Sequence, residues 1–163
     1  LAYVLPEDKL DGMLVYTADK NGEGDRYFCK DGKIQRESDD GSRDSRYPKE
    51  DDHELDVPLA VLVNGNSASA SEVFTGAVMD YDAGIVVGTT TFGKGIVQNL
   101  IPLGDGTAIK LTTAHYYTPN GFDLHGKGLE PDVVVEMDEE LQKKAVVELS
   151  EDNQLQAAIE AMN

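Results

Sequence analysis

The chain has 163 residues, 40% of them hydrophobic, so it is long and apolar enough to fold around one core. Fourteen basic residues against 31 acidic ones give a net charge of -17, which argues against nucleic acids and anionic membranes as partners. The single cysteine, Cys29, excludes an internal disulfide, and no apolar stretch approaches the roughly 18 residues of a membrane span. Because the first residue is Leu1 rather than methionine, we expect the chain to be a piece of something longer.

The first third of the chain predicts strands followed by a loop. Residues 12–19, GMLVYTAD, alternate and are rich in β-forming residues, which indicates a strand. Residues 26–37 predict a β-hairpin that turns at Asp31-Gly32. The range 37–57 carries nine acidic and three basic residues and almost nothing apolar, so we predict an acidic exposed loop.

The middle of the chain predicts a strand, a helix and a second strand. Residues 58–64, PLAVLVN, form the continuous apolar run of a strand buried on both faces. Apolar residues then recur at helical spacing up to a suitable stop at Gly84, and IVVGT at 85–89 indicates another buried strand. This βαβ order predicts an α/β fold with a mostly parallel central sheet and flanking helices.

The remaining elements are predicted by alternation and by turn residues. Residues 96–103 and 107–118 predict a β-hairpin that turns at GDG, 104–106. A short strand is expected at 132–137, and the sequence from Asp138 to the end predicts a helix whose first turn is acidic.

The stretch NGNSASASE, residues 64–72, places a serine where the buried strand gives way to the helix. Backbone N–H groups are unpaired at such a position and can receive developing negative charge, so Ser69 is a candidate nucleophile. The same stretch also fits the capping box S-x-x-E, in which Ser69 caps the helix and Glu72 bonds back. The stretch alone leaves both interpretations open.

A serine needs a base, and a lysine can serve if burial keeps it neutral. Lys94, in TTTFGKGIVQ at 89–98, has glycines on both sides and an apolar neighbourhood. The overlapping GTTTFGKG at 88–95 matches most of a phosphate-binding loop, but Gly95 replaces the magnesium-binding hydroxyl and a strand is expected where the loop needs a helix. Nucleotide binding is therefore the weakest alternative.

Four motifs, NGNSASASE, TTFGKGIVQ, LTTAHYYTPNG and GKGLEPDVVVE, together resemble the carboxyl-terminal processing (tail-specific) peptidases. These are serine proteases with a crotonase-like or ClpP-like α/β fold. The resemblance implies that Ser69 is the nucleophile, Lys94 the general base and Gln98 its assistant. It also implies that the N–H of Ala70 belongs to the oxyanion hole and that Asp80 supports activity. No cofactor and no metal are implied.

The resemblance makes one local structural demand. Fully extended, Lys94 and Gln98 would lie about 13 Å apart, so we expect a turn of helix or a tight bend between them. We further expect that no acidic side chain pairs with Lys94 and that Gln98 orients it. If Lys94 lay far from Ser69, a mechanism using His115 or His125 would take its place.

The likeness covers residues 58–136 closely and residues 1–20 more loosely. The family's upstream PDZ domain and glycine-rich oxyanion segment have no counterpart here, so residues 1–163 are expected to be a single domain, the C-terminal part of the protease domain. Alone, this fragment should be inactive or nearly so. The resemblance implies protein or peptide substrates and an extracytoplasmic location, in the cell envelope or periplasm. It also allows a membrane anchor in the full-length protein and self-association into a homo-oligomer. A catalytically silent binding module of the same fold is the alternative.

Overall fold

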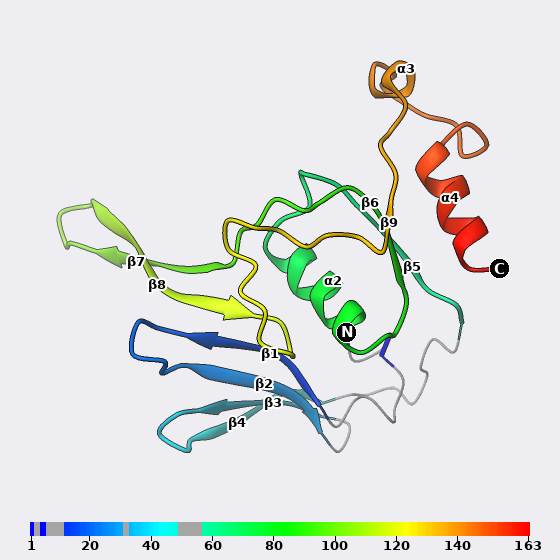
Figure 1. Cartoon of the computed structure of the whole chain (residues 1–163). Helices are drawn as coiled ribbons and strands as arrows, with labels where there is room; N and C mark the ends of the chain where they lie inside the picture. The colour runs from blue at the N-terminus through cyan, green and yellow to red at the C-terminus, as the bar shows by residue number, and fades with distance from the viewer. Residues whose placement is uncertain (2–3, 6–11, 31–32, 49–56) are drawn as a thin grey trace.

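The computed structural model describes residues 1, 4–5, 12–30, 33–48 and 57–163. The described strands are β1 (Met13–Ala18), β2 (Asp25–Lys30), β3 (Lys33–Ser38), β4 (Arg43–Pro48), β5 (Ala60–Val63), β6 (Ile85–Gly88), β7 (Ile96–Pro102), β8 (Ala108–Tyr117) and β9 (Val133–Val134). The described helices are α2 (Ala70–Asp80), α3 (Glu139–Gln142) and α4 (Asn153–Ala161). The strands form two sheets, and α2 contacts both, through β1 and β6 (Figure 1).

The larger sheet has six strands in the order β4-β3-β2-β1-β8-β7, and every described pairing in it is antiparallel. The prediction of a mostly parallel central sheet is therefore wrong. Part of the reason is topological, because short connections join β1 to β4 in succession and β7 to β8, and such connections give antiparallel pairs. The rings of Tyr16 and Tyr117, directly opposite on β1 and β8, stack with centroids 4.9 Å apart.

The smaller sheet is parallel, in the order β5-β6-β9. Strand β5, helix α2 and strand β6 form the predicted βαβ unit, which is confirmed. Val86 and Val87 of β6 are fully buried, as predicted, whereas Leu62 of β5 is 44% exposed, so the prediction of burial on both faces is wrong for β5. Helix α4 packs against β5 and β6 and covers this sheet.

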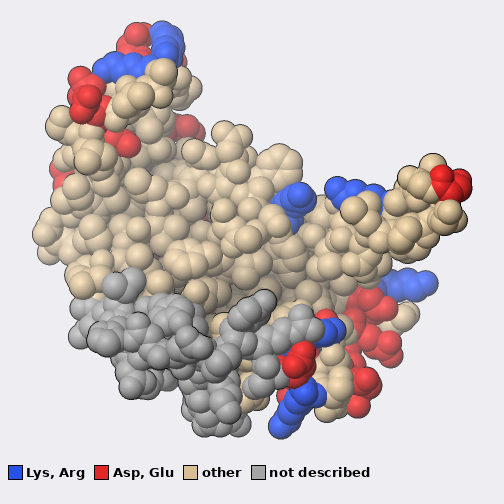
Figure 2. Space-filling model, turned by 180° about the vertical axis from the view of Figure 1, so that it is seen from behind, with Lys and Arg blue, Asp and Glu red and all other residues tan. Residues whose placement is uncertain are grey.

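The predicted hairpin of β7 and β8 is confirmed, and it forms a projecting arm. Its strands pair from Ile96–His115 out to Pro102–Ala108, whereas β8 pairs with β1 only at residues 115–117. The outer part of the hairpin therefore extends beyond the rest of the sheet as a two-stranded ribbon, seen in Figure 1 and from behind in Figure 2.

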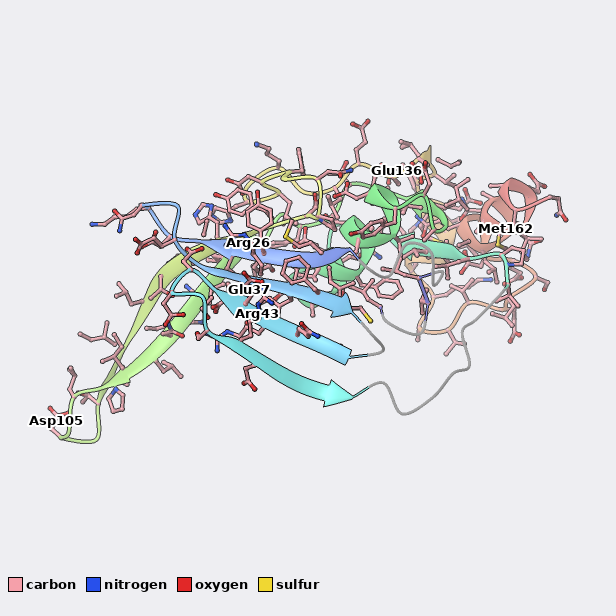
Figure 3. The ribbon with its side chains drawn as sticks, turned by 90° about the horizontal axis from the view of Figure 1, so that it is seen from below. Arg26, Glu37, Arg43, Asp105, Glu136 and Met162 are labelled. Carbon is pink, nitrogen blue, oxygen red and sulfur yellow. The ribbon has the colours of Figure 1, made fainter. Side chains whose placement is uncertain are left out.

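The predicted acidic loop at 37–57 contains a strand. β3 continues to Ser38 and β4 covers Arg43–Pro48, so the loop prediction is wrong for these residues, while 49–56 lie outside the described residues. Cross-strand ion pairs explain how so charged a sequence forms strands. Arg43 of β4 contacts Glu37 of β3 at 3.2 Å (Figure 3), and Arg36 of β3 contacts Asp25 of β2 at 2.8 Å.

The hairpin predicted at 26–37 is confirmed, because β2 pairs with β3 and Lys30 lies opposite Lys33. Its predicted turn at Asp31-Gly32 lies outside the described residues.

The C-terminal region differs from its prediction. A single helix was expected from Asp138, but α3 ends at Gln142 and α4 starts at Asn153. The side chain of Asp152 explains the second start, because it accepts hydrogen bonds from the backbone N–H groups of Gln154 and Leu155 and so caps a new helix. None of the described helices is long and apolar enough to cross a membrane.

Gly88 sets the spacing of the parallel sheet. Its φ is 132°, and a Cβ at this position would lie 2.0 Å from the carbonyl oxygen of Val63 on β5. Gly104, in the arm's turn, also has a positive φ of 85°, but no atom lies within 4 Å of its Cβ position.

We predict that Gly104→Ala lowers the free energy of unfolding by about 1–2 kcal/mol, the cost of a left-handed conformation. Gly88→Ala should lower it by about 4 kcal/mol or more, because steric overlap is added.

Urea unfolding followed by circular dichroism measures both variants. Equal losses for Gly88→Ala and Gly104→Ala would show that β5 and β6 can move apart at little cost, contrary to the expectation.

Candidate active site

Ser69 occupies a strained backbone position between β5 and α2. Its φ and ψ are 60° and -116°, a combination that residues with a side chain rarely adopt, and its side chain is half-buried. The next residue, Ala70, begins α2, and its N–H has no hydrogen-bond acceptor among the described residues. The free N–H at the helix start is suited to hold a negatively charged oxygen.

Glu72 connects this turn to a distant loop. The side chain is completely buried, with 0% exposure, and its carboxylate accepts four hydrogen bonds. Oε1 accepts from the Thr91 hydroxyl and the Gly93 N–H, both at 2.6 Å. Oε2 accepts from the backbone N–H of Ser69 at 2.9 Å and from that of Lys94 at 2.8 Å. Four bonds use the full acceptor capacity of a carboxylate.

The shared oxygen brings two predicted site residues together. Because Glu72 Oε2 is bonded to both backbone nitrogens, those of Ser69 and Lys94 cannot be farther apart than the sum of the two distances, about 5.7 Å. The structure therefore brings the F-G-K-G loop next to the predicted nucleophile through the main chain. The sequence identified Glu72 only as part of a capping box, and its bond to the Ser69 N–H confirms that half of the motif.

The side chain of Lys94 is exposed, unlike the buried lysine that the apolar neighbourhood predicted. Between residues 57 and 163, no carboxylate lies in ion-pair contact with its ammonium group. Gly93 and Gly95 beside it are both buried, so the loop's backbone is packed while the lysine side chain points outward. The ammonium group is thus accessible from the solvent side of the loop.

Of the two conformations expected between Lys94 and Gln98, a helical turn or a tight bend, the helical turn is absent, and the strand pairing has a register irregularity between Val97 and Gln98. β7 begins at Ile96, and Gln98 is already part of it. Its side-chain amide donates to the hydroxyl of Thr112 on β8 at 3.2 Å. Pairing with β8 gives the backbone N–H and C=O groups of this segment their hydrogen-bond partners, and a helical turn here would break those bonds. The structure therefore does not bring the Gln98 side chain to Lys94.

Tyr116 is a site residue that the sequence did not single out. Its hydroxyl donates to the carbonyl oxygen of Lys94, and its backbone N–H donates to Gly95 at 3.1 Å. Burial raises the pKa of the phenol, and a hydrogen bond with the Ser69 side chain opposes the rise. The alternating pattern of β8 indicates that the Tyr116 side chain points inward, but no sequence pattern predicts that it bonds to Lys94 and Ser69.

Asp80 lies at the other end of α2 from Ser69. Eleven residues of helix separate the two ends by about 16 Å. The Asp80 carboxylate accepts a hydrogen bond of 2.7 Å from the backbone N–H of Asn120, so it holds the loop that follows β8. Its contacts are those of a structural residue.

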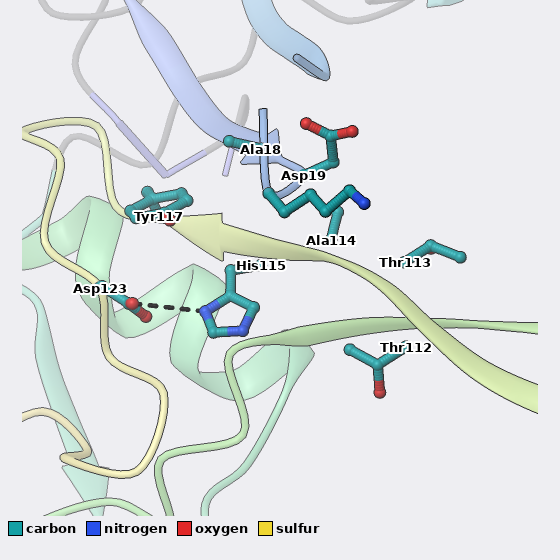
Figure 4. A pocket seen from close by; sticks show the side chains of 9 residues that line it. Ala18, Asp19, Thr112, Thr113, Ala114, His115, Tyr117 and Asp123 are labelled. Carbon is teal, nitrogen blue, oxygen red and sulfur yellow. Dashed lines mark hydrogen bonds and ion pairs between the residues drawn. The ribbon is translucent and has the colours of Figure 1, made fainter. Parts of the chain in front are cut away.

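His115 and His125, the residues of the alternative mechanism, lie next to each other. His115 Nδ1 is 3.3 Å from a carboxylate oxygen of Asp123, and the rings of His115 and His125 meet edge to face at 4.9 Å. His115 lines an open pocket of about 350 Å³ beside the end of β1 (Figure 4). Because neighbouring side chains of a strand point to opposite faces, His115 points away from the side on which Tyr116 meets Lys94.

The arrangement gives no support to nucleotide binding. The GTTTFGKG loop, 88–95, leads directly into β7, so no helix N-terminus follows it to receive a phosphate. Among the described residues, no group of three or more His, Cys, Asp or Glu side chains could hold a metal ion.

Comparison with known proteins gives a family match over most of the chain. The sequence profile of peptidase family S41 matches residues 8–135. A carboxy-terminal-processing protease of Bartonella bacilliformis is 54% identical over 79 residues, which are 48% of this chain and 18% of that protein. A probable CtpA-like serine protease of Staphylococcus epidermidis is 52% identical over 80 residues, 49% of this chain and 16% of that protein. The matched segments thus span less than a fifth of the length of these relatives.

Solved structures resemble the fold. The photosystem II D1 C-terminal processing protease matches with a TM-score of 0.60 and 34% identity, over 83% of this chain and 29% of that one. A putative S41 protease of Bacteroides fragilis matches with a TM-score of 0.67 and 15% identity, over 99% of this chain and 39% of that one. The second likeness, at low identity, concerns the fold alone.

We predict that Glu72→Gln lowers the free energy of unfolding by about 2–4 kcal/mol. The amide nitrogen of glutamine is a donor, so it would face two of the four N–H or O–H donors and leave them buried without acceptors. Thermal and urea unfolding measure the loss. The same change at Glu160, exposed on α4, is the matched control and should stay within about 0.5 kcal/mol of the unaltered protein. Equal stability of the two variants would contradict the role of Glu72.

Proposed function

We propose that this chain, which belongs to peptidase family S41, carries the nucleophile and the general base of a serine endopeptidase that cleaves proteins near or from their C-terminal tails. The names of its relatives support the substrate class, since two of them process carboxyl termini. One observation carries the assignment of the site: a single buried oxygen, Glu72 Oε2, binds the backbone N–H groups of both Ser69 and Lys94.

The proposed mechanism is acyl transfer. In this scheme the exposed side chain of Lys94 has to be shielded from solvent in the whole protein, so that it can act as a base. It then takes the proton of the Ser69 hydroxyl as the serine oxygen attacks the peptide carbonyl. The resulting oxyanion is held by the N–H of Ala70, which lies free at the start of α2. Lys94 then returns the proton to the leaving amine as the C–N bond breaks and an acyl-enzyme forms. A water molecule, deprotonated by Lys94, releases the second product and restores Ser69.

Gln98 and Asp80 have weaker support in this scheme. For Gln98 to orient Lys94, its amide must leave the hydroxyl of Thr112 and the start of β7 must bend. Asp80 acts at a distance, by holding the loop at Asn120. We assign the chemistry to Ser69 and Lys94 and keep Gln98 as a predicted orienting residue.

The rest of the proposal concerns the whole protein. We propose a crotonase-like arrangement of the protease domain, completed by a glycine-rich oxyanion segment and a PDZ domain from outside these 163 residues. Self-association and an extracytoplasmic location, in the cell envelope or periplasm, belong to the same proposal. Its support is the family membership and the short span of this chain against its relatives.

A catalytically silent binding module of the same fold is the second candidate. The exposed side chain of Lys94 and the bond from Gln98 to Thr112 favour it, because neither matches a base held ready for Ser69. The two candidates differ in one property, since only the peptidase has a serine that reacts with a fluorophosphonate.

We predict that a fluorophosphonate probe labels the whole protein at Ser69 alone and that Ser69→Ala abolishes both labelling and proteolysis. Ser69→Gly should be equally inactive but more stable than Ser69→Ala by about 1–2 kcal/mol, because glycine adopts a φ of 60° without strain. Mass spectrometry locates the label, and urea unfolding compares the variants. Labelling that persists in Ser69→Ala would remove Ser69 from the mechanism.

Lys94→Arg should be as inactive as Lys94→Ala, with kcat/KM lower by about 10²–10⁴ in both, because arginine stays protonated and cannot accept a proton. Cleavage of a fluorogenic peptide by the whole protein measures the loss. Lys143→Arg, at an exposed residue directly after α3, is the matched control and should keep full activity. Substantial activity in Lys94→Arg would rule out a lysine base.

A further inference from the structure

Strand β7 has a free edge that starts at the candidate active site. It is the last strand of the six-stranded sheet, and none of the described strands pairs with its outer side. Its first residue, Ile96, follows Lys94 by two positions. A free strand edge presents unpaired N–H and C=O groups, which can bind another extended chain.

Hydrogen bonds at both ends of β7 show which residues supply those groups. Gly95 accepts from Tyr116 of β8 at 3.1 Å, and Leu103 donates to Thr107 at 3.0 Å. Residues of an antiparallel strand alternate between facing their partner and facing away. The odd-numbered residues between these ends therefore face β8, whereas Ile96, Gln98 and Leu100 direct their backbone groups to the free edge. Pro102, which has no N–H, ends this ladder at its far side.

The two edges of the sheet differ in a way that points to a partner. Proteins usually protect an edge strand with charged residues. The opposite edge strand, β4, has the sequence RDSRYP with three charged residues, whereas β7 has the sequence IVQNLIP with none. The edge of β7 therefore lacks this protection and can pair with another extended chain.

The arm also exposes apolar side chains. Leu100 is 71% exposed, and Ile101 lies opposite Ile109 on one face of the ribbon, where both are exposed. By alternation, Leu103 and Leu111 belong to that same face, and both are exposed as well. In Figure 2 the arm is tan apart from basic atoms part-way along it and acidic atoms at its tip. An isolated two-stranded ribbon is only marginally stable in water, so a third strand with apolar side chains would stabilise it.

We propose that the free edge of β7 binds an extended, apolar segment of the protein substrate as an added β-strand and so leads the scissile bond to Ser69. The inference rests on the proposed function, because it takes the occupant to be the substrate. The position of the edge favours this occupant. A strand paired from Leu100 back to Ile96 arrives beside Lys94, whose backbone Glu72 ties to that of Ser69. A second copy on the same edge would instead block the approach to Lys94.

Amide hydrogen exchange tests the pairing directly. The whole protein with Ser69→Ala is measured by NMR with and without a saturating ten-residue peptide of alternating valine and threonine. The amides of Gln98 and Leu100 should exchange freely without peptide and at least about tenfold more slowly with it. Those of Asn99 and Ile101, already bonded to β8, should change little. This alternating pattern is specific to strand addition.

Two results would overturn the inference. Unchanged exchange at Gln98 and Leu100 in a protein that binds the peptide would place the peptide elsewhere. Slow exchange at both residues before the peptide is added would show that the edge is already occupied, by a second copy if sedimentation finds a dimer and otherwise by another strand of the same protein.

A matched pair of substitutions separates the backbone from the side chain. Leu100→Pro removes the outward N–H, and Leu100→Ala removes the same side chain but keeps that N–H. Binding is measured by the fluorescence anisotropy of the same valine–threonine peptide carrying a fluorescent label. In the Ser69→Ala background, Leu100→Pro should weaken this binding at least about tenfold relative to Leu100→Ala. Equal affinities would overturn the inference. The exchange experiment, which leaves the arm unaltered, decides the matter if Leu100→Pro does not fold.

Fluorophosphonate labelling of Ser69 in the unaltered protein keeps the two proposals apart. Labelling without protection of the β7 amides leaves the peptidase assignment standing and rejects the edge as the substrate site. Protection without labelling rejects the peptidase assignment and leaves β7 as a peptide-binding edge.

Discussion

The buried carboxylate of Glu72 is the interaction on which the candidate site depends. Burying a carboxylate costs several kcal/mol unless hydrogen bonds replace its hydration, and here four donors do so. Three of the donors belong to the loop 91–94 and one to the turn before α2. Because Thr91 also accepts a bond of 2.8 Å from the N–H of Leu129, a third segment joins the same network. Glu72 thus holds the helix start and the lysine loop directly, and the chain leading to β9 joins them through Thr91.

Local chemistry explains what the sequence predicted well. The apolar run before Ser69, the helical spacing after it and the S-x-x-E pattern all act within a few residues, so β5, α2, β6 and the bond from Glu72 to Ser69 could be predicted. The other three partners of Glu72 come from 19 to 22 residues further along the chain. No local pattern encodes such contacts, and the position of Tyr116 was missed for the same reason.

The errors have a common physical source, which is long-range pairing that overrides local propensity. Residues 43–48 are polar enough for a loop, yet β3 offers them a ladder and an ion pair between Arg43 and Glu37. Gln98 follows a glycine-rich loop that permits a helical turn, yet β8 offers it a strand partner. In both places an available sheet edge decided the conformation, and a sheet edge is not visible from the residues that join it.

The way in which Glu72 holds the site has a consequence for how such proteins diverge. It binds Ser69, Gly93 and Lys94 through their main-chain N–H groups, which every residue except proline possesses. The backbone positions of Ser69 and Lys94 are therefore independent of the hydroxyl and ammonium groups that these two residues carry, whereas the hydroxyl of Thr91 is itself part of the network. Descendants of this chain could lose the nucleophile or the base and still keep the same scaffold. Chemistry and architecture can thus be inherited separately in this fold, with Glu72 as the residue that preserves the architecture.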